Sequence, residues 1–190
     1  MNKIIYYLTA AIAALVFAAC ETKVKKEYTS VPENSKEASI KRGEYLVGIM
    51  DCHSCHTPKI MTEKGPAPDP TRLLSGYNPN VPLPQPIEKN TGWVLFAPDV
   101  TAASGPWGTS YAANLTSDAT GIGDWSFEQF RKAMTEGKYR GIDGSRPLMP
   151  PMPWQAYKSL KPEDLRALFD YLQSTQPVKN IVPAYQPPGA

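Results

Sequence analysis

Residues 52–56 read Cys-His-Ser-Cys-His, and this run constrains the fold of the chain more than any other segment. The spacing C-x-x-C-H is the signature for covalent attachment of a c-type haem. Each cysteine can form a thioether with a haem vinyl group, and the adjacent histidine can ligate the iron on one face. We therefore expect Cys52 and Cys55 to hold the haem and His56 to be an axial ligand. The motif occurs once, so one haem c is expected.

Two other kinds of site use cysteines at this spacing, and the rest of the sequence argues against both. A structural zinc site needs four protein ligands, whereas only Cys52, Cys55 and either His56 or His53 are available here, with no distant pair of cysteines or histidines. A thioredoxin-like redox site is expected among alternating strands and helices, but this motif lies between a helical pattern and a proline-rich stretch. The net charge of +2 gives no support for a nucleic-acid partner.

The first twenty residues have the pattern of a targeting segment. Lys3 supplies a positive start, residues 4–19 are uncharged and mostly apolar, and Cys20 follows directly. This pattern predicts a bacterial lipoprotein signal peptide over residues 1–19, which is cleaved before Cys20 once that cysteine carries lipid. An uncleaved membrane anchor is the alternative, although the segment is shorter than the ~20 residues of a comfortable span. An ordinary cleaved secretory signal is a third interpretation.

Lipidation would place the protein on a membrane, facing the periplasm. Residues 20–36 are polar and carry charges of both signs, which predicts a flexible tether between the lipid and the folded domain. With Cys20 lipidated and the other two cysteines on haem, no cysteine remains for a disulfide. An exported compartment would have permitted one.

Local patterns predict helices within a domain that spans residues 37–180. An imperfect apolar stripe predicts a helix over residues 40–51, which leads into the motif. Ser126 and Gln129 form a capping-box pattern. The helix that they begin is expected to stop near Gly137.

The second half of the domain contains the clearest amphipathic helix. Pro162 suits a first helical position, and apolar residues at i, i+3, i+4 and i+7 predict a helix over residues 162–174. Residues 66–86 hold seven prolines and are expected to be irregular. A C-terminal tail over residues 181–190 is expected to fray or to wrap over the surface.

Elimination leaves methionine as the second axial ligand. His53 lies inside the attachment loop, so it is not expected to reach the other face of the haem. A methionine thioether stabilises ferrous iron and raises the reduction potential. Two candidates remain, Met149 and Met152, in the proline-stiffened segment 148–154, which we call the methionine loop. Three other methionines lie on predicted helix faces or too close to the motif: Met50, Met134 and Met61.

Several separated blocks of the sequence carry a resemblance. They are Arg42-Gly-Glu-Tyr-Leu-Val47 before the motif, Asn114-Leu-Thr-Ser-Asp118, Thr120-Gly-Ile-Gly-Asp-Trp-Ser-Phe-Glu-Gln-Phe130, Asp143-Gly144, Met152-Pro-Trp-Gln-Ala-Tyr157 and Asp164-Leu-Arg-Ala-Leu-Phe-Asp-Tyr-Leu172. Together they resemble class I cytochrome c, in particular the haem domains of cytochrome subunits of membrane-bound dehydrogenases. The resemblance implies a mainly α cytochrome c fold. Crossed N- and C-terminal helices would surround one covalently bound haem, with a long proline-rich irregular insertion.

The resemblance also implies roles for individual residues. The iron ligand maps to Met152, with Met149 as the runner-up. Gly43 would allow the N-terminal helix to approach Leu168 and Tyr171 of the C-terminal helix. The aromatic residues expected to cover the haem are Trp125, Phe127, Phe130 and Trp154. The aromatic residues expected to pack on the surface, within the variable insertion, are Trp93, Trp107 and Tyr111.

These features predict an electron carrier rather than an enzyme. The protein would relay electrons between periplasmic or membrane redox partners, such as a dehydrogenase, an oxidase or another cytochrome. The alternative is a haem-based sensor or small-ligand-binding haem protein with a labile methionine ligand. A third possibility, an electron-transfer subunit of a larger dehydrogenase or oxidase, shares the chemistry and differs in its partner.

Overall fold

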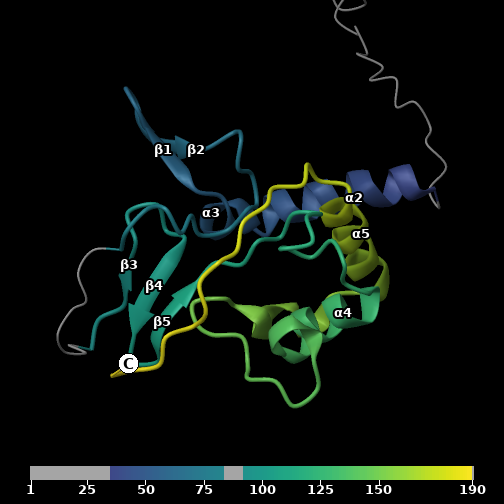
Figure 1. The fold of residues 1–190 in the computed structure, drawn as a ribbon. Coiled ribbons are helices and arrows are strands. Elements are labelled where there is room, and N and C mark those ends of the chain that lie inside the picture. Colours follow the sequence, from purple (N-terminus) through teal and green to yellow (C-terminus); the bar gives the residue numbers. More distant parts are fainter. Residues whose placement is uncertain (1–34, 84–91, 190) are drawn as a thin grey trace, which may run out of the picture. The chain divides into compact units, whose positions relative to one another are not determined.

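The computed structural model describes residues 35–83 and 92–189 of the 190-residue chain (Figure 1). The expectations for the signal peptide, for Cys20 and for most of the tether lie outside the described residues. The helices are α2 (Lys36–Ile49), α3 (Cys52–His56), α4 (Phe127–Glu136) and α5 (Pro162–Gln173), with two short 3-10 helices, η1 (Tyr139–Gly141) and η2 (Trp154–Ser159). Among these described helices, none has the length and apolar character needed to span a membrane.

Helices α2 and α5 cross at Gly43, as the resemblance predicted (Figure 1). A Cβ atom added to Gly43 would lie 2.0 Å from the carbonyl oxygen of Ala167 and 2.6 Å from the Cβ of Tyr171. The glycine therefore allows the two backbones to approach more closely than any side chain would permit. The nearest group on α5 is the Ala167 carbonyl rather than Leu168, whose side chain lies in the core instead.

The main core forms where these helices meet the segments that follow α3 and precede α4. It is a cluster of ten buried residues: Leu46, Val47, Leu74, Ile122, Phe130, Leu165, Ala167, Leu168, Phe169 and Leu172. Polar contacts also join the two helices, because Ser39 Oγ donates to Asp170 Oδ2 at 2.7 Å and Arg42 pairs with Asp164 at 2.9 Å. The exposed ion pair contributes little to stability, so the apolar crossing dominates.

We expect Gly43→Ala to lower the free energy of unfolding by about 1–3 kcal/mol, because its methyl group would overlap a backbone carbonyl that no rotamer change can move. Gly48→Ala is the matched control in the same helix, since a Cβ there meets nothing within 4 Å. It should raise stability by about 0.5–1 kcal/mol through the helix propensity of alanine. Urea unfolding of both holoproteins measures the difference, and equal effects would contradict the close crossing.

The first helix is displaced toward the N-terminus from its predicted position over residues 40–51. It begins at Lys36 because Ser35 is its N-cap, with Oγ accepting from Ala38 N at 3.0 Å. It ends at Ile49 because the chain turns before the motif, where Asp51 has a left-handed φ of 54°.

The other two helices follow their local signals. Both hydrogen bonds of the capping box between Ser126 and Gln129 are present, and α4 ends at Gly137, which has a left-handed φ of 67°. Helix α5 begins at Pro162, as predicted. Both predictions are confirmed because caps act on backbone groups within one turn of the chain.

The insertion is more regular than predicted. Strands β1 (Lys59–Thr62) and β2 (Gly65–Pro68) form an antiparallel hairpin, and β3 (Leu95–Phe96), β4 (Ala102–Gly105) and β5 (Gly108–Tyr111) form an antiparallel sheet in that order. The expectation of irregular chain from residue 66 onward was wrong for β2. A hairpin strand has one unpaired edge, so its prolines need not donate to a ladder.

The C-terminal tail wraps over the sheet. Gln186 exchanges two backbone hydrogen bonds with Thr109 of β5, at 2.8 and 3.0 Å. The hydroxyl of Tyr185 donates to the carbonyl of Trp107 at 2.5 Å. Of the two predicted behaviours of residues 181–190, wrapping is therefore the one found over residues 185 and 186.

Candidate haem-binding site

The motif forms the short helix α3, which begins directly after the left-handed turn at Asp51. Because Cys52 and Cys55 are three residues apart on this helix, their side chains leave it on the same face. Both are free cysteines and both are partly buried. His56 is the last residue of α3 and is buried. One helical turn thus presents two thiols and an imidazole together.

The surroundings of the cysteines suit haem attachment better than thiol redox chemistry. Cys52 packs against the main core. Burial raises the pKa of the Cys52 thiol to about 11, and it raises the pKa of Cys55 as well. Redox-active CxxC pairs depend on a lowered thiol pKa, because the thiolate is the reactive species. The apolar setting therefore opposes the thioredoxin-like alternative.

The orientation of His56 is set by a distant backbone group. Its Nδ1 lies 2.8 Å from the carbonyl oxygen of Ala113. Because a carbonyl only accepts, Nδ1 carries the proton and Nε2 keeps a free lone pair. Burial lowers the pKa of His56, which favours the neutral ring. Metal-ligating histidines typically have this arrangement, in which one nitrogen is anchored and the other is available.

A buried asparagine fixes the turn that supplies this acceptor. Asn114 Nδ2 donates to the carbonyl of Val178 at 2.8 Å, and Asn114 Oδ1 accepts from the backbone and hydroxyl of Thr116 at 3.0 and 2.7 Å. The backbone of His56 is held in turn, since its carbonyl accepts from Gly76 N at 2.8 Å. In the sequence, Asn114 stands out only as part of a block shared with the family. Its role could not be predicted, because Asn114 lies more than 50 residues from both His56 and Val178.

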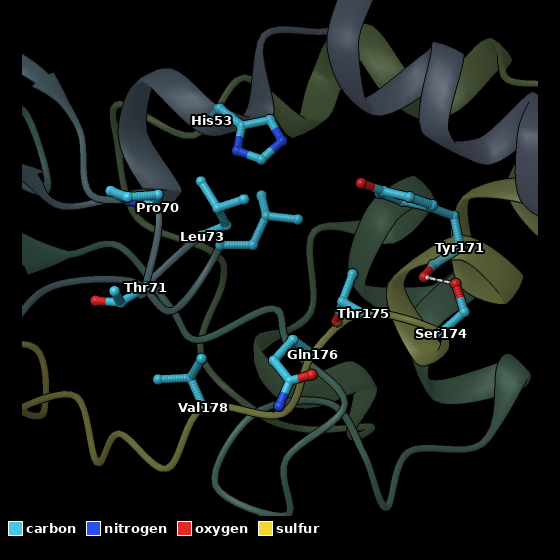
Figure 2. A pocket seen from close by; sticks show the side chains of 10 residues that line it. His53, Pro70, Thr71, Leu73, Tyr171, Ser174, Thr175, Gln176 and Val178 are labelled. Atoms are coloured by element: carbon cyan, nitrogen blue, oxygen red, sulfur yellow. Dashed lines mark hydrogen bonds between the residues drawn. The ribbon is translucent and has the colours of Figure 1, made fainter.

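His53 lies apart from the groups that orient His56. Its Nδ1 is 2.9 Å from Thr57 Oγ, and that oxygen also accepts from Leu74 N at 2.9 Å. The ring borders a cavity of about 250 Å³ to which neither cysteine nor His56 contributes. Figure 2 shows His53 and Tyr171 at two sides of this cavity. His53 therefore has a hydrogen-bond partner of its own in Thr57, whose hydroxyl is also bonded to the backbone of Leu74.

The predicted aromatic residues divide into two groups. Trp125, Phe127 and Phe130 all belong to or pack against the main core, together with Cys52. Phe127 and Phe130 also contact Phe169, with ring centroids 5.8 and 5.4 Å apart respectively. Trp154 packs elsewhere, against Gly137, where an added Cβ would lie 2.3 Å from the indole ring. The first group thus shares the main core with Cys52, whereas Trp154 packs against the C-cap of α4.

The methionine loop is anchored to the end of α4. Leu148 N donates to the carbonyl of Gly137 at 2.6 Å, immediately before Met149. Met149 and Met152 are both partly buried, so burial does not distinguish the two candidates. The methionines set aside behave as expected where the structure describes them. Met50 and Met134 pack against the main core, and Met61 is 80% exposed.

These groups fit a covalently bound haem. Two free cysteines on one face, a buried imidazole with its Nε2 available, and an adjacent apolar cluster supply attachment, one axial ligand and cover. Within residues 35–83 and 92–189, no group of three or more His, Cys, Asp or Glu side chains could hold a metal ion by itself.

Comparisons with known proteins agree with this geometry. The family model for cytochrome c matches residues 40–176. The chain is 31% identical over 184 residues to the fructose dehydrogenase cytochrome subunit of Gluconobacter japonicus, and the match covers 95% of this chain and 31% of that protein. The chain is also 31% identical over 140 residues to the gluconate 2-dehydrogenase cytochrome c subunit of Pantoea cypripedii, covering 73% of this chain and 24% of that protein.

A third relative extends the same pattern. Over 150 residues the chain is 29% identical to the cytochrome c subunit of the quinone alcohol dehydrogenase of Gluconobacter oxydans, covering 77% of this chain and 23% of that protein. The chain thus spans less than a third of the length of these curated relatives.

Proposed function

The chain belongs to the cytochrome c family, and from that premise we propose that it carries single electrons as a membrane-tethered, mono-haem cytochrome with His/Met ligation. Like the rest of the family, it binds haem c covalently. The observation that carries the proposal is the turn of α3, where two free cysteines accompany a buried His56 held by the Ala113 carbonyl. This arrangement orients a ligand firmly and offers no thiol for other chemistry.

Each residue of the site has a separate task. Cys52 and Cys55 would form the two thioethers to the haem, and His56 would hold its iron through Nε2. The hydrogen bond from His56 Nδ1 to the Ala113 carbonyl keeps the ring in one orientation and increases its basicity. Met152 would supply the second ligand, on the basis of the family pattern, with Met149 as the runner-up. When bound, the haem supplies an iron that takes up and releases one electron.

The protein environment suits repeated transfer because little has to move. The ring of His56 is held by a backbone acceptor, and that acceptor lies in the turn fixed by Asn114. The prolines of the methionine loop limit its alternative conformations. Electrons would enter and leave at the haem edge beside the two cysteines, through small and short-lived protein contacts.

The partners and the location are further parts of the proposal. Lipid on Cys20 and a flexible tether over residues 20–36 would confine the domain to a membrane surface and raise its effective concentration there. The names of the relatives support a dehydrogenase as the electron donor. Purification from membranes in mild detergent would reveal such a partner as a co-purifying protein.

The purified holoprotein tests electron transfer against ligand binding. A spectroscopic redox titration should follow a reversible one-electron curve, and the reduced protein should not bind carbon monoxide during the titration. Met152→Ala, which opens one axial position, is the positive control for binding. Rapid carbon monoxide binding by the unmodified protein would favour a sensor with a labile methionine instead.

A further inference from the structure

Strand β5 of the insertion contacts the methionine loop directly. Ser110 is 9% exposed, and its hydroxyl lies 2.5 Å from the carbonyl oxygen of Pro150. Pro150 stands between Met149 and Met152, the two candidate ligands. The hydrogen bond therefore acts at the centre of the loop, between segments 40 residues apart in the chain.

The methionine loop depends on donors from outside itself. Pro150, Pro151 and Pro153 have no backbone N–H, so they can offer only carbonyl groups. A loop of this composition forms few hydrogen bonds of its own, and its carbonyls need donors from other elements. Ser110 supplies such a donor to Pro150.

A neighbouring side chain directs the Ser110 proton toward the loop. Trp107 Nε1 donates to Ser110 Oγ at 3.3 Å, which occupies one lone pair of that oxygen. The single hydroxyl proton has two carbonyls within reach, that of Pro150 at 2.5 Å and that of Ala103 at 3.3 Å. The shorter distance favours Pro150.

The sheet that presents Ser110 contacts the C-terminal tail, and the tail in turn contacts the segment just before the methionine loop. The Tyr185 hydroxyl donates to the carbonyl of Trp107. The guanidinium carbon of Arg146, just before the loop, lies 3.8 Å from the ring centroid of Tyr139 and 5.3 Å from that of Tyr185. The insertion and the tail therefore form a fixed support beside the loop.

We propose that Ser110 is a positioning residue for the axial methionine, through which the insertion sheet holds the methionine loop in place. The inference rests on the proposed His/Met ligation and assigns a task to a segment expected only to pack on the surface. Loss of the Ser110 hydroxyl would increase the fraction of molecules in which the loop has moved and the sixth iron position is open.

Imidazole binding to the oxidised holoprotein measures that fraction. Added imidazole replaces the methionine only when the loop opens, so its apparent affinity scales with the open population. A partly buried hydrogen bond of ordinary strength predicts that Ser110→Ala binds imidazole about 2- to 10-fold more tightly than the unmodified protein. Ser104→Ala is the matched control, because its hydroxyl has a partner on Thr109 within the sheet. It should bind imidazole with unmodified affinity.

A second variant perturbs the Ser110–Pro150 hydrogen bond by removing the donor to Ser110. Trp107→Phe keeps an aromatic ring and removes the N–H that orients Ser110, so it should shift imidazole affinity in the same direction by less. If Ser110→Ala does not accumulate as holoprotein, Trp107→Phe decides the question by itself. Wild-type affinity in the variants would overturn the role of Ser110.

The optical spectrum of the unmodified protein distinguishes a failure of the Ser110 hypothesis from a failure of the proposed His/Met ligation. A weak long-wavelength band of the oxidised form reports the methionine–iron bond. Its absence from the unmodified protein would overturn His/Met ligation and the role of Ser110 together. Its presence, with unchanged imidazole affinity in the variants, would overturn the role of Ser110 alone.

Discussion

A variant in which Cys52 and Cys55 are both replaced by alanine is expected to contain no covalently bound haem. The two thiols lie one turn apart on α3 and are both free, and the chain offers no second pair at this spacing. His56 alone could bind haem only reversibly, because a single coordinate bond exchanges whereas a thioether does not. Haem staining after denaturing electrophoresis measures the loss, and the intact mass should fall by one haem.

Cys20→Ala is the matched control for this experiment, since it removes the remaining cysteine. It should keep its covalent haem, and its intact mass should show no lipid, because the attachment site would be lost. Haem that survives denaturation in the double variant would contradict the assignment of Cys52 and Cys55. Absence of lipid from the unmodified protein would favour an uncleaved anchor or an ordinary cleaved signal.

Met152→Ala is expected to lower the reduction potential by on the order of 0.1–0.3 V, because methionine ligation favours ferrous iron and axial ligands are a main determinant of haem potential. The long-wavelength band of the oxidised protein should disappear at the same time. Spectroscopic redox titration and the optical spectrum measure both effects on one sample.

Met149→Ala is the matched control, because Met149 lies in the same loop and is also partly buried. It should leave the potential and the band nearly unchanged. The opposite pattern, with the band lost only in Met149→Ala, would reassign the ligand to Met149. Loss of the band in neither variant would contradict methionine ligation from this loop.

The helices show how much local sequence can predict. The capping box at Ser126 and the proline at position 162 determined where α4 and α5 begin. The start of α2 was misplaced because its apolar stripe is irregular, whereas the N-cap at Ser35 decides the boundary. The strands of the insertion were missed for a related reason. Short strands with prolines have no clear alternation, and their pairing depends on partners elsewhere.

The candidate site divides in the same way. The roles proposed for Cys52, Cys55 and His56 follow from the sequence, because the required groups are contiguous and their chemistry depends on spacing. The acceptor of His56 Nδ1 is a backbone carbonyl 57 residues away, which no side-chain pattern marks. Ser110 was equally hidden, since a serine in a short strand has no local feature that points to Pro150.

The sequence by itself indicated the haem motif and the helix caps, and it narrowed the candidates for the second ligand to two methionines, because each of these inferences depends on groups within a few residues of one another. Only the tertiary structure decided what holds those groups in place: the backbone approach at Gly43, the carbonyl that orients His56, and the sheet beside the methionine loop. The physical reason is the range of the interactions. Hydrogen bonds and close packing between distant segments exist only after the chain has folded, and they depend on its topology rather than on local periodicity.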